Sequence, residues 1–191
     1  MNNKAYKTSL SYIVGVSLGD GNLSNPNGRA VRLRITCDKK YPKIIKNITK
    51  ELSKILPNNK ISLIDRKNCI DISCYSNKLE NLLGWKALSG SKEKQKVSVP
   101  KWILKEKVFI KKCLCGLLQT DGSIYMDRKY KYVNFTTIIP SLLKDTSNML
   151  NAIGYKHNIQ KSKQPNNKIK YVLRISINSQ KFIKDIKLWK K

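Results

Sequence analysis

Two Asp-Gly pairs, Asp20-Gly21 and Asp121-Gly122, carry the residues of this 191-residue chain best suited to chemistry. Each pair ends an apolar run, "IVGVSLGDG" at 13–21 and "LCGLLQTDG" at 114–122, with a glycine five residues before the acid. A single pair of this kind most simply marks a turn at the end of a helix. Two pairs at equivalent places favour a shared chemical role for the two carboxylates.

Small residues lie one helical turn apart in both runs, Gly15 with Gly19 and Gly116 with Thr120. Because small residues let two backbones approach closely, we expect the two helices to pack side by side with their ends together. The carboxylates and the carbonyls of the helix ends would then form an oxygen-rich cation site. We expect Mg²⁺ there, with Mn²⁺ or Ca²⁺ able to occupy the same site. Metal-assisted hydrolysis of a phosphodiester is the chemistry that fits.

The sequence contains an internal repeat and consists of two copies of one unit joined by a linker. The two acids are 101 residues apart (121 − 20), and "DISCYSNKLENLL" at 71–83 resembles "RISINSQKFIKDI" at 174–186. Each copy predicts a helix, two strands, a helix, two strands and a final helix. This order indicates an α+β fold of two pseudo-symmetric αββαββα units with two antiparallel sheets. We place the halves at 1–83 and 108–191, joined by a linker at 84–107.

The expected helices span 8–20, 41–56, 76–83, 107–121, 140–153 and 178–188. The expected strands span 22–28, 30–37, 60–66, 69–75, 123–129, 130–137, 156–163 and 169–177. Alternation along the strands predicts one buried face, with Val31, Leu33 and Ile35 in one half and every second residue from Ile169 to Ile177 in the other. The opposite face is basic, polar and aromatic. Solvated sheet faces are commonly rich in lysine, so a binding role for this face is one of two interpretations.

Lys and Arg number 39 and Asp and Glu only 12, which gives a net charge of +27. The basic residues are interleaved with apolar ones, which favours a folded protein that binds a polyanion. A lysine-heavy genome is an alternative source of the charge. No segment is long and apolar enough for a membrane span, and one His with five Cys matches no zinc motif. We expect a reducing location, cytoplasmic or in an organellar matrix.

At the two apolar runs the sequence resembles the LAGLIDADG homing endonuclease family, because both runs align without gaps with the nine-residue family motif. The second run is the closer match, and "VPKWI" at 99–103 resembles a feature of the single-chain, two-motif members. The resemblance covers nearly the whole chain. It implies an intron-encoded, site-specific endonuclease that cuts both strands of a long DNA target. The motif helices would form the central interface, and the two sheets a DNA-binding saddle.

The resemblance also implies roles for particular residues. Asp20 and Asp121 would hold a divalent metal, assisted by the carbonyls of Gly19 and Thr120. Family members carry Gln or Lys at the end of the second strand, where Lys39 is our catalytic candidate and Lys40 its alternative. The candidates for DNA contact are Arg29, Arg32, Arg34, Lys129, Lys131, Lys168, Lys170 and Arg174, with Tyr130, Tyr132 and Asn134 as candidate base readers.

The second half has no polar counterpart of Lys39 near Thr137 and Ile138, so strand-biased cutting or nicking is an expectation. We find no intein splicing signals and expect a free-standing monomer from an intron-borne gene. Two other functions stay open. One is an RNA-binding intron maturase on the same fold with weak or no nuclease activity, and the other is a DNA-binding repressor that does not cut.

Overall fold

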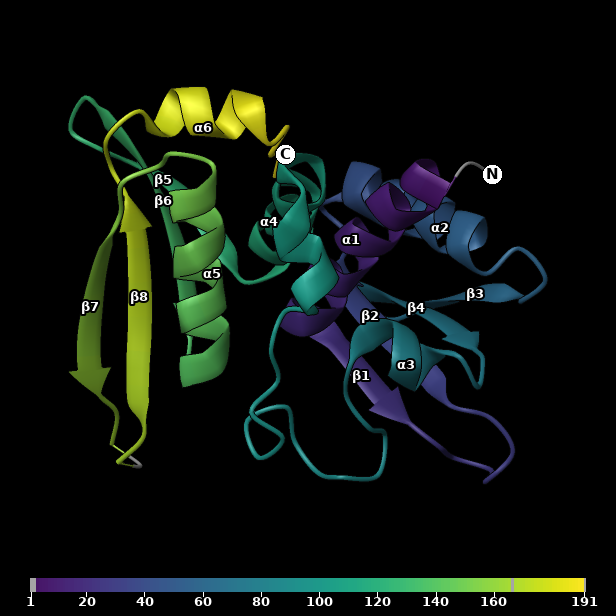
Figure 1. Ribbon diagram of the computed structural model, residues 1–191. Helices are drawn as coiled ribbons and strands as arrows, with labels where there is room; N and C mark the ends of the chain where they lie inside the picture. Colours follow the sequence, from purple (N-terminus) through teal and green to yellow (C-terminus); the bar gives the residue numbers. More distant parts are fainter. Residues whose placement is uncertain (1–2, 166, 191) are drawn as a thin grey trace.

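Two four-stranded antiparallel sheets flank a central pair of helices in the computed structural model, which describes residues 3–165 and 167–190 (Figure 1). The first half contains α1 (Asn3–Asp20), β1 (Gly21–Ser24), β2 (Arg32–Asp38), α2 (Pro42–Ile55), β3 (Ile61–Asp65), β4 (Cys69–Tyr75) and α3 (Leu79–Leu83). The second contains α4 (Lys107–Thr120), β5 (Gly122–Asp127), β6 (Tyr130–Thr137), α5 (Pro140–Ala152), β7 (Asn158–Lys163), β8 (Ile169–Ile175) and α6 (Ser179–Asp185). A short 3₁₀ helix, η1 (Lys101–Lys105), lies in the linker.

Both sheets have the same topology, with strand orders β1-β2-β4-β3 and β5-β6-β8-β7. The predicted α+β fold and its doubled αββαββα order are confirmed. Val31, Leu33 and Ile35 are buried, as the alternation predicts. The boundaries of the two halves and of the linker stay a prediction. None of the helices in the described residues combines the length and the apolar character needed to cross a membrane.

Three helix ends differ from their predicted positions by three residues or more. α3 begins at Leu79 rather than at residue 76, and the other two differ for local reasons. α1 begins at Asn3 rather than at residue 8, because its first turns are polar and largely exposed and carry no apolar pattern. α6 ends at Asp185 rather than at residue 188. There Lys187 takes a left-handed φ of 55°, and the Leu188 amide donates to the Ile183 carbonyl at 2.8 Å, which is a common way to close a helix.

Two expectations about the strands are also corrected. β1 ends at Ser24, because Pro26 follows in the loop and proline has no amide hydrogen for a ladder. The prediction that Ile169 and Ile177 are buried is wrong, since these side chains are 47% and 60% exposed. Ile169 is the first residue of β8 and Ile177 lies past its end, so both extend beyond the part of the strand that the core covers.

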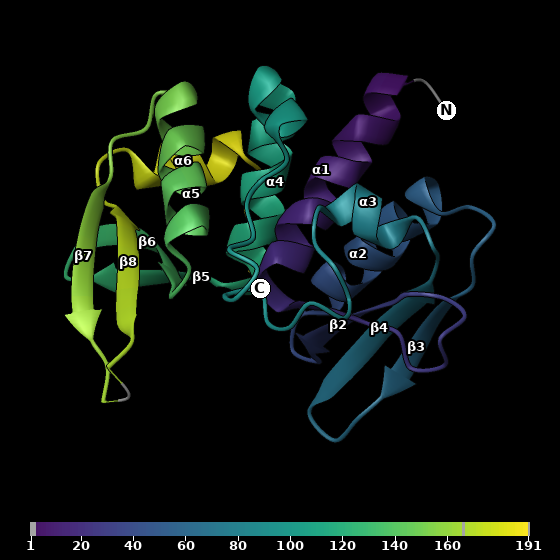
Figure 2. The ribbon, with the colours of Figure 1, turned by 60° about the horizontal axis from the view of Figure 1, so that its bottom comes forward.

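α1 and α4 lie side by side in backbone contact at the centre of the molecule (Figures 1 and 2). A methyl group at Gly15 would overlap the carbonyl oxygen of Cys113. One at Gly116 would overlap the carbonyl oxygen of Tyr12 in the same way. The predicted close approach of the two helices at small residues is therefore confirmed.

Replacing Gly116 with alanine should destabilise the protein. Alanine is favoured over glycine in a helix by about 0.5–1 kcal/mol, but forcing a group into a space already filled by backbone costs about 1–3 kcal/mol. We expect urea denaturation to show a net loss of about 1–2 kcal/mol. Ser53→Ala on the exposed side of α2 should stay within about 0.5 kcal/mol of the wild type. Equal stability of Gly116→Ala and the wild type would contradict the backbone contact.

Candidate functional site

Asp20 and Asp121 stand at the C-terminal ends of α1 and α4, where the two helices meet. A Cβ at Gly19 would lie 3.3 Å from the Cγ of Asp121, so the helix ends touch at the acids. Gly21 and Gly122 begin β1 and β5 directly after each acid, and a side chain at either would overlap the last turn of its own helix. Each Asp-Gly pair thus lets the chain leave the helix at once and keeps a carboxylate at its end.

The surroundings of the two carboxylates make both of them harder to ionise. Burial first, and then the charge of Asp20, raise the pKa of Asp121 to about 6. Asp20 is the more exposed of the two, and the protein around it still raises its pKa through burial. The charges of Lys92 and Lys190 lower both pKa values without cancelling these effects. The two carboxyl groups therefore keep raised pKa values even with two lysines beside them.

Lys92 from the linker and Lys190 near the end of the chain bind the carbonyls of the two helix ends. Lys92 Nζ donates to three carbonyls in the last turn of α1, that of Gly19 included. Lys190 Nζ donates to the Thr120 carbonyl at 3.1 Å and to the Gly122 carbonyl. Burial lowers the pKa of both lysines, against the opposite effect of the two carboxylates. Each negative helix end thus faces an ammonium group.

Sequence reasoning missed both lysines. Lys92 follows Asp20 by 72 residues (92 − 20), and Lys190 follows Asp121 by 69 (190 − 121), so the repeat itself contained a signal. The linker and the end of the chain share no recognisable pattern, however. In a chain with 39 basic residues, spacing alone does not distinguish two functional ones.

The donors at the helix ends are all oxygen atoms. Among residues 3–165 and 167–190, no group of three or more His, Cys, Asp and Glu side chains could hold a metal ion. The helix ends instead offer two carboxylates and the carbonyls of Gly19 and Thr120, which accept hydrogen bonds from the lysines. Adjacent carboxylates and backbone carbonyls are the oxygen donors that hard cations such as Mg²⁺, Mn²⁺ or Ca²⁺ prefer. The residues present therefore fit a divalent ion.

Lys39 points away from the aspartates. Its Nζ pairs with the Asp65 carboxylate, and its side chain lines a groove between α2 and β3. Lys40 lines a cleft of about 950 Å³ together with Lys190. The Lys40 Nζ pairs with the Asp38 carboxylate at 2.7 Å, so both candidate amines bind carboxylates other than those at the helix ends.

A second, smaller cleft lies on the other side of the acids. Its volume is about 320 Å³, and its lining includes Asp121, Lys92, Thr137 and Ile138. Thr137 is buried, and its hydroxyl oxygen accepts a hydrogen bond from the Ile139 amide at 3.1 Å. The two clefts are therefore chemically unequal, because an amine follows the second strand of the first half and an isoleucine follows that of the second.

The second sheet carries an aromatic and cationic cluster on the face opposite its buried residues. Tyr125 stacks on Tyr132 with ring centroids 5.4 Å apart, and the Arg174 guanidinium lies 5.6 Å from the Tyr132 ring. Asn134 is the cross-strand partner of Arg174. The Asn134 side-chain oxygen and Arg174 Nε are buried without a hydrogen-bond partner among the described residues. Unpaired buried polar groups favour a partner molecule on this face. Tyr125 was not among the predicted residues.

On the corresponding face of the first sheet, polar side chains form hydrogen bonds with one another. Arg32 Nε donates to Ser24 Oγ at 3.2 Å. Buried Asp71 accepts hydrogen bonds from Thr36 at 2.6 Å and from Arg66 Nε at 3.1 Å. The hydrogen bond from Thr36, and then that from Arg66, lower the pKa of the Asp71 carboxyl. This acid orders a basic face and does not join the pair at the helix ends.

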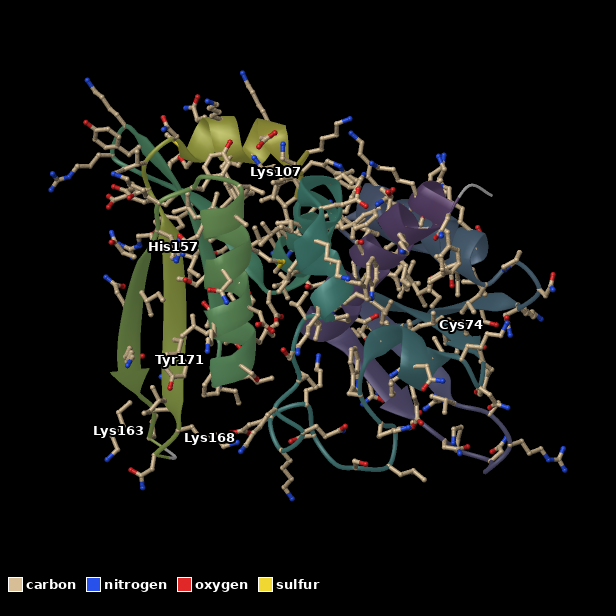
Figure 3. The ribbon with its side chains drawn as sticks, viewed as in Figure 1. Cys74, Lys107, His157, Lys163, Lys168 and Tyr171 are labelled. Atoms are coloured by element: carbon tan, nitrogen blue, oxygen red, sulfur yellow. The ribbon has the colours of Figure 1, made fainter. Side chains whose placement is uncertain are left out.

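The other predicted DNA-contact residues lie at accessible positions, where contact with DNA stays a prediction. Lys168, next to the start of β8, pairs with Glu93 of the linker, and Figure 3 shows it at the lower end of the hairpin. Exposed positions are held by Arg29, Lys129 and Tyr130, and half-buried ones by Arg34, Lys131 and Lys170.

Comparisons with known proteins agree with this geometry. Residues 109–187 match the family model described as a LAGLIDADG-like domain. The crystal structure of I-DmoI in complex with DNA and Mn covers 95% of this chain and 97% of its own, with 20% identity and a TM-score of 0.71. The chain has the two-motif LAGLIDADG fold. An I-DmoI variant in complex with its target DNA and Mg gives the same TM-score and identity, and the match covers 96% of this chain and 98% of the variant.

The LAGLIDADG fold of this chain also resembles the N-terminal LAGLIDADG domain of DUF199/WhiA. That match has 16% identity and a TM-score of 0.62, and it covers 96% of this chain and 84% of the other. No curated protein sequence matches the chain. At identities this low the likeness extends to the fold, and activity has to follow from the site itself.

The acid pair should make the stability of the metal-free protein depend on pH. Between about pH 4 and 6, the folded protein keeps a proton on Asp121 that the unfolded chain has released. Stability therefore falls as the pH rises through this window. We expect Asp121→Asn to reduce the fall, while the raised pKa of Asp20 leaves a smaller one. At pH 7.5 this variant should exceed the wild type by on the order of 1 kcal/mol, after allowance for solvent screening.

Urea denaturation in EDTA from pH 4 to 7.5 measures this difference. Asp127→Asn, at the exposed end of β5, is the control and should follow the wild-type curve. Parallel curves for Asp121→Asn and the wild type would show that the two acids do not strain the fold.

Proposed function

We propose that the protein is a site-specific endonuclease that uses a divalent metal, Mg²⁺ in its natural setting, to hydrolyse both strands of a long DNA target. The observation that carries this proposal is the meeting of Asp20 and Asp121 at the ends of two packed helices, beside Lys92 and Lys190. The sheets lie on both sides of this centre (Figure 1). I-DmoI, of the same fold, is known in complex with DNA and Mn or Ca, which supports a metal-dependent activity on DNA.

Asp20 and Asp121 would hold the metal, with the carbonyls of Gly19 and Thr120 as further donors. A metal bound there activates water and stabilises the leaving oxygen of the phosphodiester. The chain itself keeps the two carboxylates adjacent. It also keeps them ionised above neutral pH, because the raised pKa of Asp121 is still only about 6. Below that pH, protons would compete with the metal for the site.

Lys92 and Lys190 would offset negative charge on the phosphate. Their partial burial strengthens the attraction of each ammonium group for an anion. One lies at each helix end, which suits a centre that acts on two DNA strands. Lys40, after the second strand of the first half, lines the cleft of Lys190, whereas Ile138 takes that place in the other cleft and Lys170 of β8 is the second amine there. Because the two clefts place their second amine at different positions, we expect one DNA strand to be cut faster.

The sheets would position and read the DNA. The net charge of +27 supplies a sequence-independent attraction to phosphates. On the second sheet, Arg174 and Asn134 are cross-strand neighbours on the face opposite the core, where their side chains suit base edges in the major groove, and the stacked Tyr125 and Tyr132 support the arginine. Both motif helices belong to one chain, so a monomer suffices. An intron-borne gene is part of this proposal.

Cleavage of a plasmid library with randomised sites in Mg²⁺ tests the activity and reveals the target together. We expect specific double-strand cuts by the wild type. Asp20→Asn and Asp121→Asn should each slow cutting by at least about 100-fold, because the metal supplies several kcal/mol of charge stabilisation. Glu106→Gln, an exposed change at the start of α4 and so at the opposite end of the helix from Asp121, should cut at the wild-type rate.

Undiminished cutting by either motif variant would contradict the two-acid centre. If the wild type cuts nothing and prefers intron RNA to duplex DNA, with no effect of Asp20→Asn, an RNA-binding maturase replaces the nuclease. Tight binding of duplex DNA without any cutting would favour a repressor.

A further inference from the structure

After α6 the chain returns to the helix pair and brings Lys190 beside the acids. Residues 186–190, called here the C-terminal tail, run from α6 back towards α4 (Figures 1 and 2). Within the tail, Leu188 is buried and Lys190 reaches the carbonyls at the end of α4. The contacts that hold the tail against α4 therefore determine the position of the Lys190 ammonium group.

Gln119 is a buried polar side chain of α4 and is only 3% exposed. Its Nε2 donates to the Trp189 carbonyl at 3.2 Å. Its Oε1 accepts from the Tyr12 hydroxyl of α1 at 2.6 Å. The bond to Trp189 fixes which end of the amide faces the tail, because a carbonyl can only accept and must meet the nitrogen, and the Tyr12 hydroxyl then donates to the oxygen.

A second contact to the tail lies one turn earlier on α4. Cys115 Sγ is 3.6 Å from the Lys187 carbonyl, as a weak hydrogen bond. Cys115 and Gln119 are four residues apart and lie on the same face of the helix. They bind tail carbonyls two residues apart, and the next residue after Trp189 is Lys190.

We propose that Gln119 is a positioning residue that ties the C-terminal tail to α4 and so places the Lys190 ammonium beside Asp121. Its effect on cleavage rests on the proposed nuclease function, whereas its hold on the tail does not. Leu18, which occupies the equivalent position of the first motif, is also buried, so packing alone does not require a polar side chain there. A buried amide without partners would be costly, and here both ends have one.

The linker loop that carries Lys92 is likewise held by a glutamine, Gln95. The Gln95 side chain accepts from the Lys86 amide at 2.9 Å and donates to the Lys86 and Gly90 carbonyls at 2.9 and 2.8 Å. These bonds close the linker loop that carries Lys92. Each lysine of the centre thus has one glutamine that ties its segment in place, the linker loop in one case and the tail in the other.

A labelling experiment tests the hold on the tail without any need for activity. The metal-free protein is treated briefly with acetic anhydride, and acetylation of Lys190 is measured by mass spectrometry relative to exposed Lys187. Loss of one net hydrogen bond corresponds to a factor of about 2 to 10. We expect Gln119→Leu to raise the relative labelling of Lys190 by this factor. Cys113→Ala, a buried change on the same helix, should leave it unchanged.

Tyr12→Phe is the second variant if Gln119→Leu folds poorly. It keeps the glutamine but removes the hydrogen-bond donor to its oxygen, which loosens the side chain, so we expect a smaller rise in Lys190 labelling. Wild-type labelling of Lys190 in every folded variant of this pair would overturn the proposal.

Single-turnover cleavage of the selected target then tests the consequence for chemistry. Gln119→Leu should slow cutting with little change in DNA affinity. It should add little to the effect of Lys190→Met in the double variant, because both changes act through the same ammonium group. Additive effects would overturn the link to Lys190. If the wild type does not cut DNA at all, the nuclease proposal fails and the labelling result alone decides the hold on the tail.

Discussion

Backbone contact between α1 and α4 at Gly15 and Gly116 is the constraint on which the rest of the molecule depends. Side chains larger than hydrogen at these places would separate the helices and with them the two aspartates at their ends. Each half places a sheet outside its own motif helix, so the same contact also sets how the two sheets lie relative to the centre (Figure 2). The same helix contact therefore determines both the packing of the core and the position of the two aspartates at its end.

The charges at the helix ends follow from that contact. Two carboxylates and the negative ends of two helices meet in a partly buried place, and burial raises both carboxyl pKa values. Lys92 and Lys190 come from segments far from the motifs and bind the helix-end carbonyls. The charges of the two lysines lower the carboxyl pKa values without cancelling the effect of burial. The centre consequently retains an attraction for a small divalent cation in a chain whose overall charge is strongly positive.

The sequence was sufficient for the parts that depend on local pattern. The doubled motif predicted the fold, the helix contact and the pairing of Asp20 with Asp121, since spacing along a helix determines which residues share a face. The lysines were not predictable, because their positions depend on how a loop and a tail fold back over long distances. Lys39 and Lys40 show the same limit, since both lie in the turn after β2, where strand alternation no longer determines which way a side chain points.

Anomalous diffraction from crystals grown with Mn²⁺ tests the central claim most directly. The account predicts a manganese peak within coordinating distance of a carboxylate oxygen of Asp20 and one of Asp121, and no such peak in Asp20→Asn. Manganese held elsewhere on the protein, with these two carboxylates free of metal, would contradict it.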